Sequence, residues 1–452
     1  MYDLVIRGGF VIDPANRIFS RQNLAIKDGK VAALSTKELP AREFIDAEGL
    51  HVAPGFVDMH MHEDVYDPGK DAFMVTIFAS MLRMGVTTVV GGNCGIGTPD
   101  PGGYLQAVDR LGTPVNVALY AAHSEIRKRY SPENYQPVSA DIIRNMARDL
   151  EEQLEQGCVG VSFGLRYVPG TSASEVHELA RVAARHGKLL AAHARDDAAY
   201  IFEAARELIG LAEREKATVQ ISHIGSMAAY GQMEEVLSMV DAACAAGLDV
   251  GLDCYPYNAF CTSIGSATYD PGFLERYDVD YDGVEVCGGK YRGQRCTKAI
   301  FDEVRSETPE ILAVAHVMKE SEVDMALAHP RVILASDGIL FDGFGHPRAA
   351  GSFPRFLDRY VKEKRLLGLA EAVAKMTCLP ARRVGIAKGS LGVGDDADVV
   401  LFDYAAVRDR ADFAEPLTPP LGIRRVLIGG KTALNDTEIC DGHLGRAVRR
   451  FA

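Results

Sequence analysis

The sequence predicts an α/β protein: a closed (β/α)8 barrel of the TIM type with a small β-sandwich domain formed by the N- and C-terminal segments. Two observations predict this fold. Eight nearly continuous apolar runs alternate with helical stretches, as in a parallel sheet buried on both faces. Roughly the first 50 and the last 65 residues instead form short strand patterns separated by turns, too few at either end for a covered sheet.

The small β domain is therefore expected over residues 1–55 and 385–452, and the barrel over residues 56–384. The eight barrel strands are expected, in chain order, within residues 51–62, 85–95, 115–123, 158–165, 188–196, 218–225, 248–257 and 331–338. Helical stretches are clearest at 140–157, 173–187 and 233–247. The connection over about 258–330 is far longer than an ordinary loop, which indicates an inserted subdomain or lid beside the barrel mouth.

The composition is that of an ordinary soluble globular protein, with 47% hydrophobic and 25% charged residues. A net charge of −13 argues against nucleic acid and anionic membranes as partners. The N-terminus has no signal-peptide pattern, and no apolar run has the length of a membrane span. Nine cysteines without CxxC spacing favour reduced thiols and a cytoplasmic location. The oligomeric state stays open.

Side chains able to bind a metal stand at the ends of five predicted strands. They are His60 and His62 on the first, Cys94 on the second, His193 on the fifth, His223 on the sixth and Asp337 on the eighth. All strands of a parallel barrel end at the same mouth, and His60 and His62, two residues apart, share one face of their strand. The pattern therefore predicts a divalent metal site rather than scattered polar groups of the core.

Sequence motifs extend this interpretation along nearly the whole chain. They include APGFVDMHMH, GVTTVVGGNCG, GLRYVPG, HARDD, ISHIG, DCYPYNA, SDG and HPRAAGSFPRFL. With these motifs the chain resembles the amidohydrolase superfamily and, within it, the N-acyl-D-amino-acid deacylase (D-aminoacylase) branch. The GNCG and HPRxxGxFPR patterns are specific to that branch.

The resemblance implies how the metal would be held. Many superfamily members bridge two metals with a lysine at the end of the fourth strand, but VGVSFGLRY has none. In this branch a cysteine after the second strand binds the metal, and Cys94 stands there. The implied ligands are Cys94, His193 and His223 for one tightly bound zinc ion. A second, weaker site would use His60, His62 and Asp337, with Cys94 bridging, and whether one or two metals are needed stays open.

The implied reaction is hydrolysis of an amide bond in a small N-acyl amino acid. Zinc lowers the pKa of bound water, so that hydroxide is available as the nucleophile at neutral pH, and it polarises the scissile carbonyl. Asp337 would carry the proton of the water to the leaving nitrogen. Arg348 matches the arginine of the branch that binds the substrate carboxylate, and Tyr167 and Tyr257 match its substrate-contacting aromatics. The branch commonly has a lysine two residues after the sixth-strand histidine, where this chain has Gly225.

Two alternatives to the deacylase interpretation remain. The first is a cyclic amidase that opens a ring, as dihydroorotases and hydantoinases do; the missing fourth-strand lysine and the HPRAAGSFPR motif weigh against it. The absence of a cation at Gly225 keeps cyclic amides and differently charged acyl compounds under consideration. The second is a non-catalytic binding relative on the same fold, which the complete set of metal-binding residues disfavours.

Overall fold

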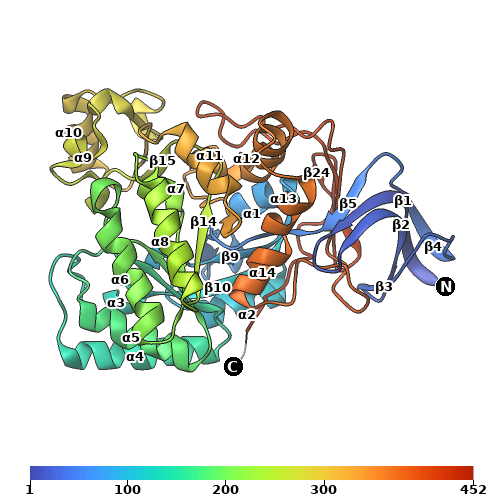
Figure 1. Cartoon of the computed structure of the whole chain (residues 1–452), viewed down its shortest axis with the longest axis horizontal. Helices are drawn as coiled ribbons and strands as arrows, with labels where there is room; N and C mark the ends of the chain where they lie inside the picture. The colour runs from blue at the N-terminus through green and yellow to red at the C-terminus, as the bar shows by residue number, and fades with distance from the viewer. Residues whose placement is uncertain (451–452) are drawn as a thin grey trace.

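The computed structural model describes residues 1–450 and confirms the predicted fold class. Figure 1 shows a helix-surrounded barrel beside a separate sheet that carries the N-terminus. The eight parallel barrel strands pair in chain order. They are β6 (Phe56–Asp58), β9 (Val86–Gly91), β10 (Asn116–Ala122), β11 (Gly160–Gly164), β12 (Leu189–His193), β13 (Thr218–Ile221), β14 (Val250–Cys254) and β18 (Val332–Leu334).

The barrel closes just beyond the ends of its first and last strands. Met61 and Gly338 form a parallel bridge there. The amide N–H of Asp337 donates to the carbonyl of His60 at 2.7 Å, and that of His62 donates to the carbonyl of Gly338 at 2.9 Å. The residues that complete the cylinder are therefore the predicted metal ligands or their neighbours.

Amphipathic helices cover the outside of the barrel. In α4 (Ala140–Glu155), Ile143, Met146, Leu150 and Leu154 recur at helical spacing and are buried, and Ser139 caps the helix through the Ile142 amide. The other long helices are α2 (Pro101–Leu111), α5 (Ala173–Arg185), α6 (Ile201–Arg214) and α8 (Met233–Ala245). Shorter ones are α1 (Ile77–Arg83), α3 (His123–Lys128), α7 (Ile224–Ala228), α11 (Glu320–Ala328), α12 (Arg348–Arg355), α13 (Leu369–Met376) and α14 (Cys378–Val384). No helix within residues 1–450 combines the length and apolar character needed to cross a membrane.

Both ends of the chain contribute to one nine-stranded sheet, as predicted. Its strands enclose a small apolar core that includes Val11, Leu24, Val52 and Leu401. The N-terminal strands are β1 (Tyr2–Asp13), β2 (Ile18–Lys27), β3 (Lys30–Ser35), β4 (Ala41–Asp46) and β5 (His51–Pro54). The C-terminal strands are β21 (Val399–Phe402), β22 (Ile423–Ile428), β23 (Lys431–Asn435) and β24 (Glu438–Ile439).

Two segments differ in detail from the sequence-based expectation. The apolar run over residues 51–62 is not one strand: β5 pairs with β1 and β21 in the nine-stranded sheet, and β6 begins the barrel after Gly55. Residues 443–450, expected in the small β domain, lie against the barrel instead, where Gly445 bridges Thr113 and Ala447 bridges Val117. Both differences from the prediction arise because strand pairing between distant segments decides the structure, and the pattern of apolar residues does not specify that pairing.

The long seventh connection folds as an insertion. It contains the three-stranded antiparallel sheet β15 (Phe260–Ser263), β17 (Leu312–Ala315) and β16 (Val284–Val286), together with α9 (Phe273–Tyr277) and α10 (Lys298–Glu307). Figure 1 shows it at one end of the barrel, above α6 and α7. Short hairpins β7 (Tyr66–Asp67)–β8 (Ala72–Phe73) and β19 (Leu340–Phe341)–β20 (Phe344–Gly345) follow the first and last barrel strands.

Candidate active site

The structure brings all six predicted metal-binding side chains together at the barrel mouth. Ligand atoms of His60, Cys94, His223 and Asp337 all lie within 4.8 Å of one another, and all four residues are buried. The Cys94 Sγ is 3.3 Å from Nε2 of both His60 and His223. This set of one thiol, two imidazoles and one carboxylate suits zinc, which accepts mixed sulfur, nitrogen and oxygen ligands.

His62 and His193 flank this cluster on two sides. The His62 Nε2 is 3.4 Å from Asp337 Oδ1, and the His193 ring centroid is 4.5 Å from that of His223. The Nδ1 atoms of both rings are buried without a hydrogen-bond partner within residues 1–450. Buried, unpaired imidazole nitrogens beside a thiol and a carboxylate fit a metal-binding role better than a structural one.

The backbone at three of these residues is strained. Cys94, His223 and Asp337 have positive φ angles of 54°, 34° and 48°, a conformation that costs a non-glycine residue on the order of 1–3 kcal/mol. Gly92 also has a positive φ, and a Cβ there would lie 2.6 Å from the Tyr120 carbonyl oxygen. Each strand thus ends in a sharp turn that directs the following side chain into the mouth, and strain of this kind clusters at functional sites.

The cluster has the electrostatics of a cation site. Burial alone would raise the pKa of the Cys94 thiol, but the adjacent imidazoles of His60 and His223 hold it well below its usual value. Burial would likewise raise the pKa of Asp337, yet Arg348 and the histidines keep it well below its usual value. Burial and the neighbouring His223 lower the pKa of His193 to about 4, so at neutral pH its imidazole is uncharged and able to bind a metal.

A buried carboxylate that the sequence interpretation missed orients two of the histidines. Asp253, on β14, contacts His60 Nδ1 at 3.0 Å and accepts the His223 backbone N–H at 2.8 Å. The Ser226 hydroxyl lies 3.0 Å from His223 Nδ1. Both contacts leave the Nε2 atoms facing Cys94, as required of metal-ligating imidazoles. A single acid inside the apolar run LDVGLDC was the sequence feature that could have identified Asp253.

Replacing Asp253 by Asn should weaken zinc binding about 10- to 100-fold, because the amide no longer offers two acceptor oxygens to hold His60 and Gln220. Competition with a chromogenic chelator measures the affinity. Asp249→Asn is the matched control, since Asp249 precedes the same strand and contacts Arg383 and Thr218 instead. Equal zinc affinity in the two variants would contradict the orienting role.

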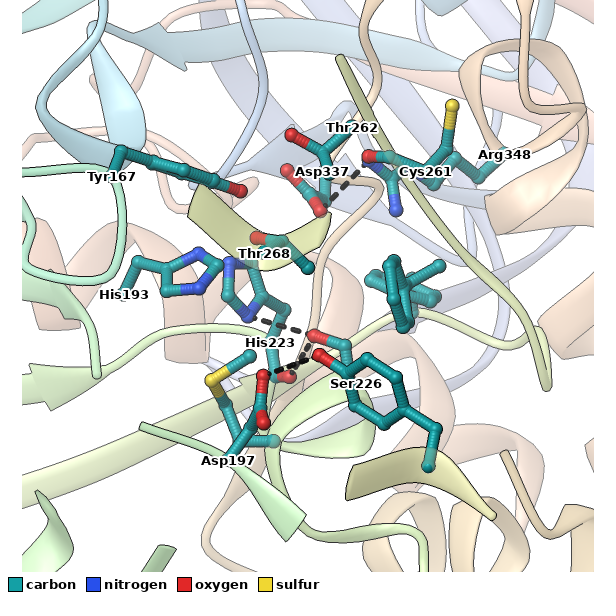
Figure 2. Close-up of a pocket in the computed structure, with 14 residues that line it drawn as sticks. Tyr167, His193, Asp197, His223, Ser226, Cys261, Thr262, Thr268, Asp337 and Arg348 are labelled. Carbon is teal, nitrogen blue, oxygen red and sulfur yellow. Dashed lines mark hydrogen bonds and ion pairs between the residues drawn. The ribbon is translucent and has the colours of Figure 1, made fainter. Parts of the chain in front are cut away.

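A narrow pocket of about 20 Å³ adjoins the cluster on the side of the insertion. Figure 2 shows Tyr167, His193, His223, Asp337 and Arg348 facing it. Arg348 is buried and its Nη2 lies 2.9 Å from Asp337 Oδ2, while its Nε has no hydrogen-bond partner within residues 1–450. Tyr167 packs on the His193 ring with centroids 4.5 Å apart.

Tyr257, predicted to contact substrate, does not line this pocket. Its hydroxyl donates to Asp409 at 3.2 Å, and its ring packs under the Arg355 guanidinium. Tyr255 lines the pocket instead and lies beneath Arg348, 4.7 Å from its guanidinium carbon. The chain leaves β14 at Cys254, so strand alternation no longer determines which of the two tyrosines points inward.

Gly225 lies in tightly packed surroundings. A Cβ at this position would be 2.9 Å from the Cys254 Sγ and 3.2 Å from the Met318 Cε. A lysine side chain would therefore require both neighbours to move, and the site is built around the glycine. Arg348 is the only Lys or Arg among the described residues that line the pocket.

Comparison with known proteins places this geometry in a family. The amidohydrolase family matches residues 51–229 and again residues 313–433. The N-acyl-D-glutamate deacylase of Alcaligenes xylosoxydans xylosoxydans is 36% identical, over 95% of this chain and 93% of that protein. The chain belongs to the amidohydrolase family. This amidohydrolase is a metal-dependent hydrolase of amide carbon–nitrogen bonds, of the D-aminoacylase branch, as the motifs predicted.

Solved structures agree with this assignment of the amidohydrolase. The N-acyl-D-glutamate deacylase of Bordetella bronchiseptica, crystallised with zinc and a phosphonate mimic of the tetrahedral intermediate, matches with a TM-score of 0.89 and 32% identity, covering 99% of this chain and 100% of that one. A D-aminoacylase structure described for its binuclear metal centre matches with a TM-score of 0.89 and 30% identity over the whole of both chains.

Proposed function

We propose that this amidohydrolase is a zinc-dependent deacylase that cleaves N-acyl-D-amino acids into a carboxylic acid and a free amino acid. The observation that carries the proposal is the convergence of Cys94, His60, His223 and Asp337 beside a pocket with one buried arginine. Similarity to deacylases over nearly the whole chain supports the substrate class.

We assign Cys94, His193 and His223 to the tightly held zinc, and His60, His62 and Asp337 to a weaker site with Cys94 shared. A bound zinc ion would supply the acidity of the attacking water and polarise the scissile carbonyl. Asp337 would accept the proton from that water and deliver it to the leaving nitrogen. Its low pKa keeps the carboxylate ionised at neutral pH, ready to act as the base.

Arg348 would bind the substrate carboxylate. Its Nε is free of protein partners within residues 1–450, and carboxylates pair with two guanidinium N–H groups at once. Tyr167, packed on His193, would shape the opposite wall of the pocket. Tyr257, which bonds Asp409 outside the lining residues, is replaced in this proposal by Tyr255.

The pocket favours neutral over acidic amino-acid side chains. With Arg348 occupied by the α-carboxylate, no other cation lines the described pocket. The Asp197 carboxylate also lines the pocket. Tyr277 donates a hydrogen bond to Asp197 Oδ2 at 2.7 Å, and Arg276, which does not line the pocket, contacts the same carboxylate. A glutamate or aspartate side chain would therefore meet a like charge.

A substrate screen tests the proposal. Zinc-loaded enzyme is incubated with paired D and L N-acetyl amino acids, N-formyl analogues and cyclic ureides, and free amine is measured. We expect amine release from the D series alone, with kcat/KM about tenfold or more higher for methionine or leucine than for glutamate or aspartate. Ring opening of ureides without amine release would instead identify a cyclic amidase.

Arg348→Lys should raise KM for N-acetyl-D-methionine roughly 100-fold, because a single ammonium replaces a two-point carboxylate contact. Arg359→Lys, in the helical segment directly after α12 and paired with Glu320, is the matched control and should retain wild-type kinetics. Steady-state kinetics of both variants at fixed zinc content decide the matter. An unchanged KM in the Arg348 variant would remove this residue from substrate binding.

We also propose that the enzyme acts on a small-molecule substrate without nucleic acid or membrane as a partner, with its oligomeric state left open, and that it works in the cytoplasm. The net charge of −13 supports the first statement. For the second, all nine cysteines lie within residues 1–450 and are unpaired, and the Cys94 thiol must stay reduced to bind a metal.

A further inference from the structure

A second cleft reaches the metal cluster and shares no lining residue with the arginine pocket. Its volume is about 690 Å³, and it is walled by the segments following β6, β9 and β18. His62 belongs to its lining, and the Nε2 of this residue lies 3.4 Å from Asp337 Oδ1. Asp337, in turn, lines the arginine pocket. The cluster therefore stands between two separate openings.

The surface of this cleft is unusually apolar for an exposed region. Val65 and Met74 are 62% and 61% exposed, and Ile96 is also exposed. Ile339 and Leu340 continue the same lining. Large aliphatic side chains gathered at one exposed place are a mark of a ligand or partner site.

Two of the three acidic residues that line the cleft, Glu63 and Asp64, are hydrogen-bonded by the protein, and the third, Asp342, is exposed. Glu63 accepts the amide N–H groups of Gly92 and Thr98 at 2.6 and 2.8 Å. Asp64 accepts those of Thr76, Ile77 and Phe78 at the start of α1. No Lys or Arg lines the described cleft, so an anionic ligand would find no cation to pair with there. The exposed aliphatic side chains of the lining instead match an aliphatic chain.

We propose that this cleft binds the acyl chain of the substrate and that the enzyme favours N-acyl-D-amino acids with an unbranched aliphatic acyl group longer than acetyl. The inference rests on the proposed function, which places the amino-acid half in the arginine pocket. With the scissile amide at the cluster, the acyl half has to leave in the other direction, past His62. Apolar contacts there stabilise each added methylene.

A chain-length series tests the inference. The kcat/KM of zinc-loaded enzyme is measured on N-acetyl-, N-butanoyl-, N-hexanoyl- and N-octanoyl-D-methionine. We expect a rise of roughly 100-fold from acetyl to octanoyl, as about half of the transfer free energy of six methylenes would give. The double variant Val65→Ser/Met74→Ser should lose most of that rise and keep its rate on the acetyl compound. Val393→Ser, an exposed valine of the small β domain, is the matched control.

Binding without turnover provides a second readout. Calorimetry of the metal-free protein should detect neutral octanamide but not acetamide, and the double variant should lose the octanamide signal. Comparable kcat/KM for all four acyl groups would overturn the acyl cleft and leave the deacylase proposal standing. Absence of amine release from every D substrate, with zinc bound, would defeat both. A change in sedimentation in the double variant with an unaltered chain-length series would make the patch an interface between copies and overturn the inference.

Discussion

Replacing Asp337 by Asn should lower kcat by about 1000-fold or more, because the amide cannot accept a proton from the attacking water. The substitution is conservative for the fold: Asp337 has φ 48°, a conformation that asparagine also tolerates, and its backbone N–H still reaches the His60 carbonyl. Zinc in the Cys94–His193–His223 site should therefore remain, which elemental analysis of the purified variant would show.

The controls separate loss of the proton carrier from loss of structure. Asp28→Asn lies in the turn between β2 and β3, also at a positive φ, and should be nearly as active as wild type. Thermal unfolding of both variants should match that of the parent within a few degrees. A kcat for Asp337→Asn within tenfold of wild type would show that another group moves the proton.

Replacing Cys94 by Ser should remove the tightly bound zinc and nearly all activity. The thiol lies between the Nε2 atoms of His60 and His223, and these imidazoles favour its ionised form. A serine hydroxyl stays protonated at neutral pH and binds zinc far more weakly than a thiolate. We expect less than about a tenth of the wild-type zinc content after dialysis against a chelator, with activity reduced roughly 1000-fold.

Cys254→Ser is the matched control for the thiol. Cys254 is equally buried, but burial raises the pKa of its thiol to about 12, so the sulfur is a neutral core atom. Its Sγ contacts only the adjacent Tyr255 carbonyl at 3.4 Å among hydrogen-bond acceptors of the described chain. The control should keep its zinc. Full zinc occupancy in Cys94→Ser would contradict the assigned ligand set.

The fold was predictable because barrel strands buried on both faces have nearly continuous apolar sequences. It was predictable also because the carboxyl ends of parallel strands all lie at the same mouth of the barrel. The same two rules predicted that His60, Cys94 and Asp337, from three distant segments, lie close together, as they do in the structure. The inserted subdomain was predictable as an excess of chain between two strands. Its three-stranded sheet was not, because antiparallel pairing depends on partners rather than on composition.

What could not be predicted involves groups whose roles come from neighbours. Asp253 resembles any strand acid until the structure places it against His60. Tyr255 and Tyr257 are indistinguishable in CYPYN, and only the packing of Tyr257 beside Asp409 decides between them. Arg348 was expected to bind the substrate carboxylate and Asp337 to bind metal, yet the two side chains pair with each other. This pairing, too, is evident only from their proximity in three dimensions.

The closure of the cylinder through His60, Met61, Asp337 and Gly338 links the ion to the integrity of the whole domain. An ion held by His60, His62 and Asp337 would link the end of the first barrel strand to the end of the last. Its removal should therefore weaken the pairing between these two strand ends before the pairing between any other two strands. Amide hydrogen exchange at residues 61–62 and 337–338 should accelerate on chelation, while the amides of β11 and β12, on the far side, remain protected.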